Sequence, residues 1–262
     1  MYRAIAVFDL DNTLLNTEKQ ISTENLAALK ALQEAAVFPV IATGRDRFEI
    51  QDVIDAGQFD TIISANGADV YSKGQQLLEH AIAPDLLAQL AQWADAHQTP
   101  MAFSDHDGIA INLINSLVET NYSRIHRHTP RIDPTFYQGR AITKVLPFLG
   151  MDAADRAQEQ ALRTTFDQLT FYRDSDVCMD VVASGTNKAS GISTLLTTLG
   201  NSKLPVYAFG DGHNDIAMLQ AATYGIAMGN ANATVQANAD YVTANFDDGG
   251  IVKALRHFKV IA

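Results

Sequence analysis

The sequence predicts an α/β fold, with a doubly wound, mainly parallel sheet and an inserted α+β domain. Short, continuously apolar runs are typical of central parallel strands that are buried on both faces. Three such runs lie near the chain ends, at residues 5–8, 38–42 and 206–209. Helical patterns alternate with these runs, whereas the middle of the chain has a less regular rhythm. We therefore expect residues 1–82 and 185–262 to form one domain and residues 83–184 to form the inserted domain.

The N-terminal segment shows the alternation clearly. Ser22 or Thr23 can cap a helix that continues to about residue 36. Leu26, Leu29 and Leu32 would share one face of this helix. The other elements expected here are a strand at 38–42, a helix at 46–56, a strand at 61–64 and a hairpin at 70–78.

The inserted segment mixes helices with strands that can pair antiparallel. Helices are expected at 84–97, 116–125 and 152–166, and strands at 101–103, 109–112, 142–149, 169–172 and 177–182. The alternation then resumes in the C-terminal segment. We expect helices at 187–199, 216–222 and 250–258, and strands at 206–209, 224–228 and 241–242.

The composition restricts partners and location. The net charge of −11 and the pI of about 4.9 oppose binding to nucleic acid or to anionic lipid. No apolar run approaches the roughly 20 residues that cross a bilayer, and the N-terminus lacks a signal-peptide pattern. Cys178 is the single cysteine, so no intrachain disulfide can form. We expect a cytoplasmic protein without nucleic-acid or membrane partners; its oligomeric state is not indicated.

Aspartates follow the first and the last of the long apolar runs. Asp9 and Asp11, in the segment DLDNT, can face one ligand if the backbone stays extended, and two carboxylates suit phosphoryl transfer. The alternative is a simple turn, which Asp, Asn and Thr favour. Asp211 and Asp215, in GDGHND, can form an oxygen-rich pocket, or they can cap a helix. His213 is expected to be an exposed loop residue.

A divalent cation would reconcile these aspartates with one another. If Asp9 and Asp211 come within about 4 Å, their repulsion costs about 4 kcal/mol at an effective dielectric constant near 20. Oxygen ligands without clustered Cys or His favour Mg²⁺ over zinc.

Two further segments can bind a phosphoryl group. Thr43, Gly44 and Arg45 follow the second apolar run, where a hydroxyl and backbone N–H groups can hold phosphoryl oxygens. Lys188 begins a predicted helix, where the helix dipole disfavours a positive charge. A contact with phosphate or with Asp9 would explain this lysine; the alternative is a solvated surface residue.

The order of these segments resembles the haloacid dehalogenase (HAD) superfamily. The chain has DxDxT, ATGR, an interruption, a lysine at a helix start and GDGxND, with the first, second and last each following a strand. This order is similar to that of Cof-type (subclass IIB) phosphatases, which have a large inserted cap. The segments 66–68 and 224–231 also resemble that family, so the likeness covers nearly the whole chain. One departure is Ala189, where these proteins often have glycine.

The resemblance implies a Mg²⁺-dependent phosphatase with a HAD-like Rossmannoid core and a substrate-selecting cap. Asp9 would form an aspartyl-phosphate, and Asp11 would be the general acid and base. Asn214 and Asp215 would orient Lys188, the metal or its waters. Substrate contacts are expected from Thr43, Gly44, Arg45, Asn66, Lys188 and Asn214. Metal contacts are expected from Asp9, Asp11 (through its backbone carbonyl), Asp211 and Asp215.

The resemblance suggests small phosphorylated metabolites as substrates, with sugar phosphates first and pyridoxal or flavin-related phosphates as alternatives. A phosphomutase of the same layout, similar to phosphomannomutases, and a receiver-like phospho-switch are the competing functions. The inserted segment has a locally basic stretch that can bind an anionic group or form a solvated surface. Its residues are Arg124, His126, Arg127, His128, Arg131 and Arg140.

Overall fold

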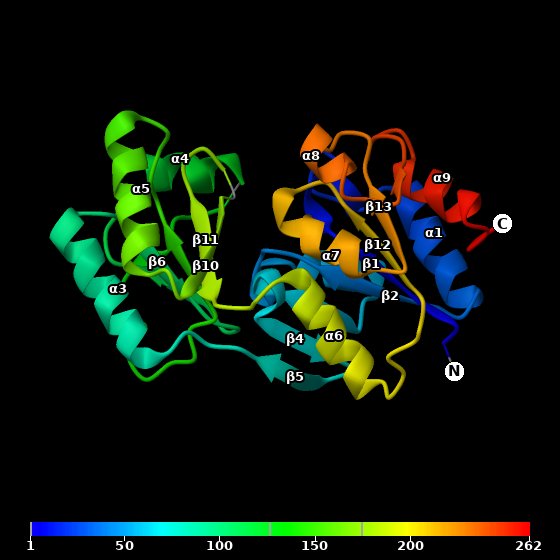
Figure 1. Cartoon of the computed structure of the whole chain (residues 1–262), viewed down its shortest axis with the longest axis horizontal. Helices are drawn as coiled ribbons and strands as arrows, with labels where there is room; N and C mark the ends of the chain where they lie inside the picture. The colour runs from blue at the N-terminus through cyan, green and yellow to red at the C-terminus, as the bar shows by residue number, and fades with distance from the viewer. Residues whose placement is uncertain (1, 126, 174) are drawn as a thin grey trace. The chain divides into compact units, whose positions relative to one another are not determined.

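The computed structural model describes residues 2–125, 127–173 and 175–262 (Figure 1). It divides the chain into two compact units. The core unit comprises Met1–Leu78 and Asn187–Ala262, and the inserted unit comprises Glu79–Thr186. The sequence-based limits of the inserted domain, 83–184, lie a few residues inside these bounds.

The core unit contains an eight-stranded sheet in the order β14-β13-β12-β1-β2-β3-β4-β5. The strands from β14 to β3 are parallel, and β4 pairs antiparallel with β3. This arrangement confirms the predicted fold class of a doubly wound, mainly parallel sheet. The strands are β1 (Ala4–Phe8), β2 (Val37–Ala42), β3 (Thr61–Ser64), β4 (Asp69–Ser72), β5 (Gln75–Glu79), β12 (Val206–Gly210), β13 (Tyr224–Ala227) and β14 (Tyr241–Val242).

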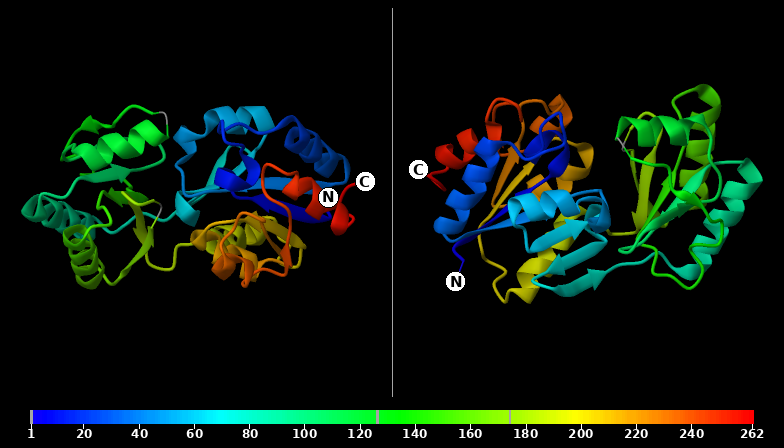
Figure 2. Two further views of the ribbon diagram at one scale, coloured as in Figure 1. Left: turned by 90° about the horizontal axis from the view of Figure 1, so that it is seen from above. Right: turned by 180° about the vertical axis from the view of Figure 1, so that it is seen from behind.

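Both faces of this sheet are buried, which explains why its central strands are apolar throughout. Along β1, Ala4, Ala6 and Phe8 belong to one hydrophobic cluster, and Ile5 and Val7 belong to another. The first cluster includes side chains of α1 (Thr23–Glu34), α2 (Gln51–Gly57) and α9 (Gly250–His257). The second includes side chains of α6 (Lys188–Thr198), α7 (Ile216–Ala221) and α8 (Ala233–Gln236). Figure 2 shows these helices on opposite sides of the sheet.

The helix predicted at 46–56 is interrupted. A 3₁₀ turn, Arg47–Glu49, precedes α2, and Ile50 between them has a non-helical backbone (φ −124°, ψ 22°). The turn is closed by a capping box in which the Asp46 N–H donates to Glu49 Oε2 at 2.9 Å. Ile50 is fully buried in the first cluster, so its packing is compatible with the break.

The inserted unit contains a six-stranded sheet in the order β10-β11-β9-β6-β7-β8. All its pairings are antiparallel except that of β7 with β8. Side chains of α3 and α5 pack in one cluster with this sheet, and side chains of α4 pack in another. The strands are β6 (Met101–Ser104), β7 (Ile109–Ile111), β8 (Arg131–Ile132), β9 (Lys144–Pro147), β10 (Leu169–Arg173) and β11 (Met179–Ala183). The helices are α3 (Pro84–His97), α4 (Ser116–Arg124) and α5 (Ala153–Thr165).

The sequence did not predict β8 or α8, which are only two and four residues long. Such short elements carry too few residues for a periodic pattern. Among the described residues, no helix has both the length and the apolar character needed to span a membrane.

Candidate active site

The candidate site lies where the strand order of the core sheet reverses. β1 has β2 on one side and β12 on the other. The carboxyl ends of these three neighbouring strands lead directly to Asp9, Thr43 and Asp211. In doubly wound sheets, ligands bind at this reversal point. The sheet therefore brings together segments that are about 200 residues apart in the chain.

The backbone turns after β1. Asp9 (φ −65°, ψ 161°) and Asp11 (φ −71°, ψ 125°) keep extended backbone angles, but Leu10–Leu14 form a π-helical turn in which Asn12 is left-handed (φ 56°, ψ 20°), a conformation that asparagine tolerates well. The Asp9 carboxylate contacts Lys188, whereas the Asp11 carboxylate contacts Arg45 and Lys19. The two carboxylates have different partners here, and their facing one ligand stays a prediction.

Three carboxylates converge around one buried lysine. Asp9, Asp211 and Asp215 each offer an oxygen within 4.8 Å of the others. Lys188 is fully buried, and its Nζ donates to Asp9 Oδ1 at 2.5 Å and to Asp215 Oδ1 at 2.6 Å. One positive charge is too little for three negative charges, so this group of side chains has an excess of negative charge. An all-oxygen set with such an excess suits a hard divalent cation.

The crowding of charge shifts the pKa values of these groups. Burial raises the pKa of Asp9 well above its ordinary value, although the charge of Lys188 opposes this shift. Burial and the charge of Asp215 raise the pKa of Asp211 to about 7. Burial lowers the pKa of Lys188, but the charges of Asp215 and Asp9 outweigh burial and raise it above its ordinary value. The lysine is therefore a permanent cation in this site.

Asp215 and Thr13 hold the loop that carries Asp211. Asp215 Oδ2 accepts hydrogen bonds from the backbone N–H groups of Asp211 and Gly212, each at 2.9 Å. A Cβ on Gly210 would lie 2.5 Å from Asp215 Cγ, so this close approach requires glycine. Thr13 Oγ1 donates to Asp211 Oδ1 at 3.2 Å. Local residue patterns indicated no separate role for Thr13, because its partner is 198 residues away.

Asp11 is held by two cations. Arg45 donates through Nε to Oδ2 at 2.8 Å and through Nη2 to Oδ1 at 2.6 Å. Lys19 Nζ donates to Oδ1 at 2.7 Å. Burial raises the pKa of Asp11, but the charges and hydrogen bonds of Arg45 and Lys19 outweigh burial and leave this pKa below its ordinary value. In this arrangement Asp11 is an anion.

Lys19 was not among the predicted site residues. It lies in a tight hairpin whose ends are joined by the bridge between Leu15 and Ile21. The hairpin is closed by the Asn16 N–H donating to the Gln20 carbonyl at 2.9 Å. No motif marks Lys19, because only the folding of this hairpin brings its side chain back to Asp11.

The remaining predicted residues lie on loops of the same unit. Thr43 is buried, and its Oγ1 accepts from the Arg45 N–H at 3.1 Å, with Gly44 between them. Asn214 Nδ2 donates to Asn66 Oδ1 at 2.9 Å, so the two residues, both predicted to contact substrate, are hydrogen-bonded to each other. His213 is exposed, as predicted.

Gly67 allows the loop of Asn66 to approach the start of α6. It has a φ of +100°, and a Cβ here would lie 2.1 Å from the Asn187 carbonyl oxygen. Asn187 caps α6, the helix that begins with Lys188, and its side chain accepts from the Ser190 N–H. This close approach therefore fixes the position of Lys188 relative to the loop after β3.

Members of the basic stretch form ion pairs inside the inserted unit. Arg124 pairs with Asp176, and Arg140 Nε donates to Asp105 Oδ2 at 2.6 Å. Arg127, His128 and Arg131 are exposed, and His126 lies outside the described residues.

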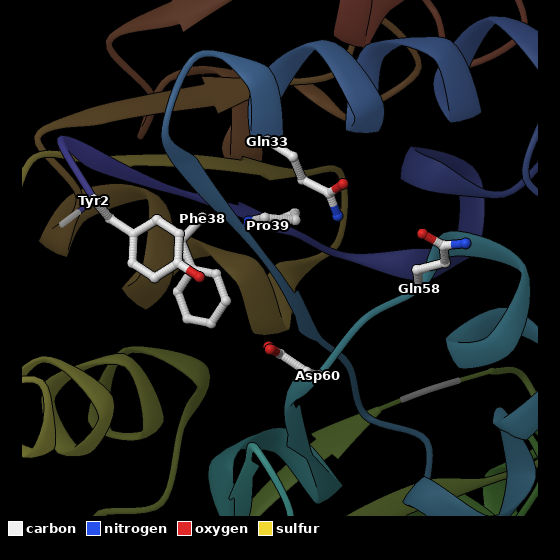
Figure 3. Close-up of a pocket in the computed structure, with 6 residues that line it drawn as sticks. All are labelled: Tyr2, Gln33, Phe38, Pro39, Gln58 and Asp60. Carbon is white, nitrogen blue, oxygen red and sulfur yellow. The ribbon is translucent and has the colours of Figure 1, made fainter.

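A separate hollow lies in the core unit, at the amino end of β2. Its volume is about 260 Å³, and Figure 3 shows its lining residues. They are Tyr2, Gln33, Phe38, Pro39, Gln58 and Asp60. The hollow is at the opposite end of the parallel strands from Asp9, so it is not part of the carboxylate site.

Comparison with known proteins identifies the family. The family model of haloacid dehalogenase-like hydrolases matches residues 6–255. The chain belongs to this family. The resemblance to HAD proteins that its motifs predicted is therefore confirmed.

Related proteins of known name and structure agree with this assignment. HMP-PP phosphatase from Citrobacter koseri is 30% identical over 234 residues, which cover 87% of this chain and 84% of that protein. The Bacillus subtilis (strain 168) 5-amino-6-(5-phospho-D-ribitylamino)uracil phosphatase YcsE is 29% identical over 260 residues, covering 97% and 95%. The HAD subclass IIB sugar phosphatase BT4131 has a similar structure, with a TM-score of 0.87, 28% identity and coverage of 98% and 100%. This HAD-like hydrolase is thus a phosphatase.

Proposed function

We propose that the protein hydrolyses phosphate monoesters of small metabolites through an aspartyl-phosphate on Asp9, with Mg²⁺ as its cofactor. The observation that carries this proposal is the position of the Asp9 carboxylate. It lies at the carboxyl end of β1 next to the buried cation of Lys188 and the carboxylate of Asp211. Sugar phosphates are the substrate class that we favour, in line with the sugar phosphatase among its structural relatives.

The residues fit a magnesium ion. The side chains of Asp9 and Asp211, with the backbone carbonyl of Asp11, would hold it, and Mg²⁺ would neutralise charge on the carboxylates and on the phosphoryl oxygens. Asp215 is also a predicted ligand, and one of its oxygens lies within 4.8 Å of ligand oxygens of Asp9 and Asp211. Its two oxygens accept hydrogen bonds from Lys188 and from two backbone N–H groups, which also suits a role in positioning these groups.

The reaction would proceed in two in-line displacements. In the first, the Asp9 carboxylate attacks phosphorus, the bond to the leaving oxygen breaks, and Asp11 gives that oxygen a proton. In the second, Asp11 takes a proton from water as the water oxygen attacks phosphorus, and Asp9 leaves as a carboxylate. Lys188 and Thr43 would bind the phosphoryl oxygens in both steps.

The ion pairs of Asp11 affect its two tasks differently. The ionised form is the form that accepts a proton from water, so the arrangement is ready for the second step. For the first step Asp11 must carry a proton. The substrate must therefore weaken the hold of Arg45 and Lys19 on this carboxylate.

Two conservative variants test this function. Phosphate release from a panel of sugar phosphates, nucleotides and cofactor phosphates should require Mg²⁺ and should disappear in Asp9→Asn. Asp11→Asn should lose turnover by about 10²-fold or more while its circular dichroism spectrum stays unchanged. Unchanged turnover in Asp11→Asn would contradict its role, and undiminished release after chelation would contradict the metal requirement. Isomer formation from a hexose phosphate, followed in parallel, separates hydrolysis from mutase activity.

The inserted unit would act as the cap that selects the substrate, and no partner other than a small phosphorylated metabolite is proposed. A cytoplasmic location remains a prediction, which is based on the single cysteine and on the apolar pattern of the sequence.

A further inference from the structure

The Asp11 carboxylate has two positively charged side chains as partners. Lys19 and Arg45 together bring two positive charges to one carboxylate. Within the described part of the chain, Lys19 Nζ has one ion-pair partner, which is Asp11. The side chains of Lys19 and Asp11 are 37% and 35% exposed, so an incoming molecule can reach both. The buried Lys188, by contrast, is accessible only from inside the site.

The proposed role of Asp11 limits the distance between Lys19 and the leaving group. A leaving oxygen that takes a proton from Asp11 must lie at about 2.7 Å from one of its carboxyl oxygens. Lys19 Nζ is 2.7 Å from Oδ1. The leaving oxygen then lies at most about 5 Å from Lys19 Nζ if Oδ1 carries the proton, and at most about 8 Å if Oδ2 carries it. An anionic group one or two bonds beyond the leaving oxygen can therefore form a direct ion pair with Lys19.

Such an anion would give Lys19 a partner other than Asp11, and the Asp11 carboxylate would keep its two hydrogen bonds from Arg45. A neutral leaving group offers Lys19 no ion pair.

We propose that Lys19 is a specificity-determining residue that selects substrates whose leaving group carries a second anionic group, a phosphate or a carboxylate, close to the scissile oxygen. This inference rests on the proposed function and narrows its substrate class. Within the sugar phosphates, the favoured substrates are those whose sugar carries a second phosphate or a carboxylate close to the ester oxygen. Diphosphate monoesters and phosphorylated hydroxy acids share this feature, and phosphates of neutral sugars or alcohols are the poorer substrates.

A matched pair of small probes tests the proposal. Next to the ester carbon, phosphoglycolate carries a carboxylate, whereas hydroxyethyl phosphate carries a neutral hydroxymethyl group. We expect the wild-type protein with Mg²⁺ to show a kcat/KM about tenfold higher for phosphoglycolate. Lys19→Gln should reduce that ratio to near one, mainly by lowering kcat/KM for phosphoglycolate. Lys19→Arg should restore most of it, because the charge is kept.

A control variant and the opposite results complete the test. Lys30→Gln removes an exposed lysine of α1 and should leave both probes unaffected. Equal losses on both probes in Lys19→Gln would overturn the proposal, since that result means Lys19 only supports Asp11. Equal wild-type rates for the two probes would also overturn it. If neither probe releases phosphate in the wild-type protein, the proposal for Lys19 is overturned. The panel of phosphate esters described above then decides separately whether the proposed phosphatase function fails as well.

Discussion

The carboxylate cluster should make the metal-free protein less stable than it would be without Asp211. The perturbation is Asp211→Asn, which keeps the shape of the side chain and removes one of three converging negative charges. The pKa of Asp211 rises from 3.8 to about 7 in the folded protein. A tenfold change in an acid dissociation constant corresponds to about 1.36 kcal/mol, so the ionised carboxylate costs up to about 4 kcal/mol above neutral pH.

The sign of the pH dependence follows from this raised pKa. Between pH 4 and pH 7 the folded protein binds more protons at Asp211 than the unfolded chain does, so its stability falls as the pH rises. Partial exposure of the side chain screens the charge, and we therefore expect about 2 to 4 kcal/mol at pH 8. In a unit of this size that corresponds to about 5 to 15 °C in Tm.

The assay is thermal unfolding in a metal chelator, followed by circular dichroism at pH 5 and pH 8. Asp211→Asn should melt above the wild-type protein at pH 8, and the difference should shrink to about a third at pH 5 because the folded protein keeps most of its Asp211 protons there. Adding Mg²⁺ should raise the wild-type Tm and have little effect on the variant, because binding to the folded state stabilises it. Asp247→Asn, at an exposed position of the same unit, is the control. Equal Tm values for Asp211→Asn and wild type at both pH values would refute the reasoning.

Two further predictions concern stability, one in the core unit and one in the inserted unit. Gly67→Ala should lower the free energy of unfolding by more than about 2 kcal/mol, because it combines a positive φ with a clash against the Asn187 carbonyl. Gly74→Ala is the control, because Gly74 has a φ of +82° and no neighbour lies within 4 Å of the added Cβ, so this variant should lose only the stability that backbone strain costs. If denaturant titrations give equal losses of stability for the two variants, the clash at Gly67 is contradicted. In the inserted unit, burial raises the pKa of Asp105, but hydrogen bonds and the charge of Arg140 outweigh burial and lower it. This ion pair therefore stabilises the folded protein at pH values above the ordinary Asp pKa, and its contribution is lost as the pH falls through the lowered pKa. The Arg140→Gln variant should lose less stability between pH 5 and pH 2 than the wild-type protein. Parallel pH profiles of the two proteins in urea unfolding would contradict this expectation.

The sequence predicted most elements because their local signals are strong. Short, continuously apolar runs predict central strands that are buried on both faces. Helix starts have a local signal too: Ser22, Asp152 and Asn187 cap helices at or next to the predicted starts. Where local signals compete, the prediction was wrong. The segment 46–56 has a helical pattern, yet the capping box at Asp46 begins a 3₁₀ turn that ends at Glu49, and α2 begins only after Ile50.

Within the site, the residue types and their order along the chain were enough to indicate phosphoryl-transfer chemistry. Carboxylates after two strands, a lysine at a helix start and a net acidic surface left few alternatives, and the family assignment followed from them. The positions of these groups relative to one another were not predictable in the same way. Asp9 and Lys188 are 179 residues apart, and only the tertiary fold, in which the start of α6 lies against the loop after β3, brings Lys188 to the end of β1.

The sequence by itself thus determined the fold class, the family and the acidic residues of the candidate site, because each depends on local patterns of apolar and charged side chains. The tertiary structure decided what each carboxylate faces. The Asp11 carboxylate contacts Arg45 and Lys19, and the buried Lys188 joins Asp9 to Asp215. Charge partners depend on distances of a few ångströms across the fold, and no spacing along a chain encodes them.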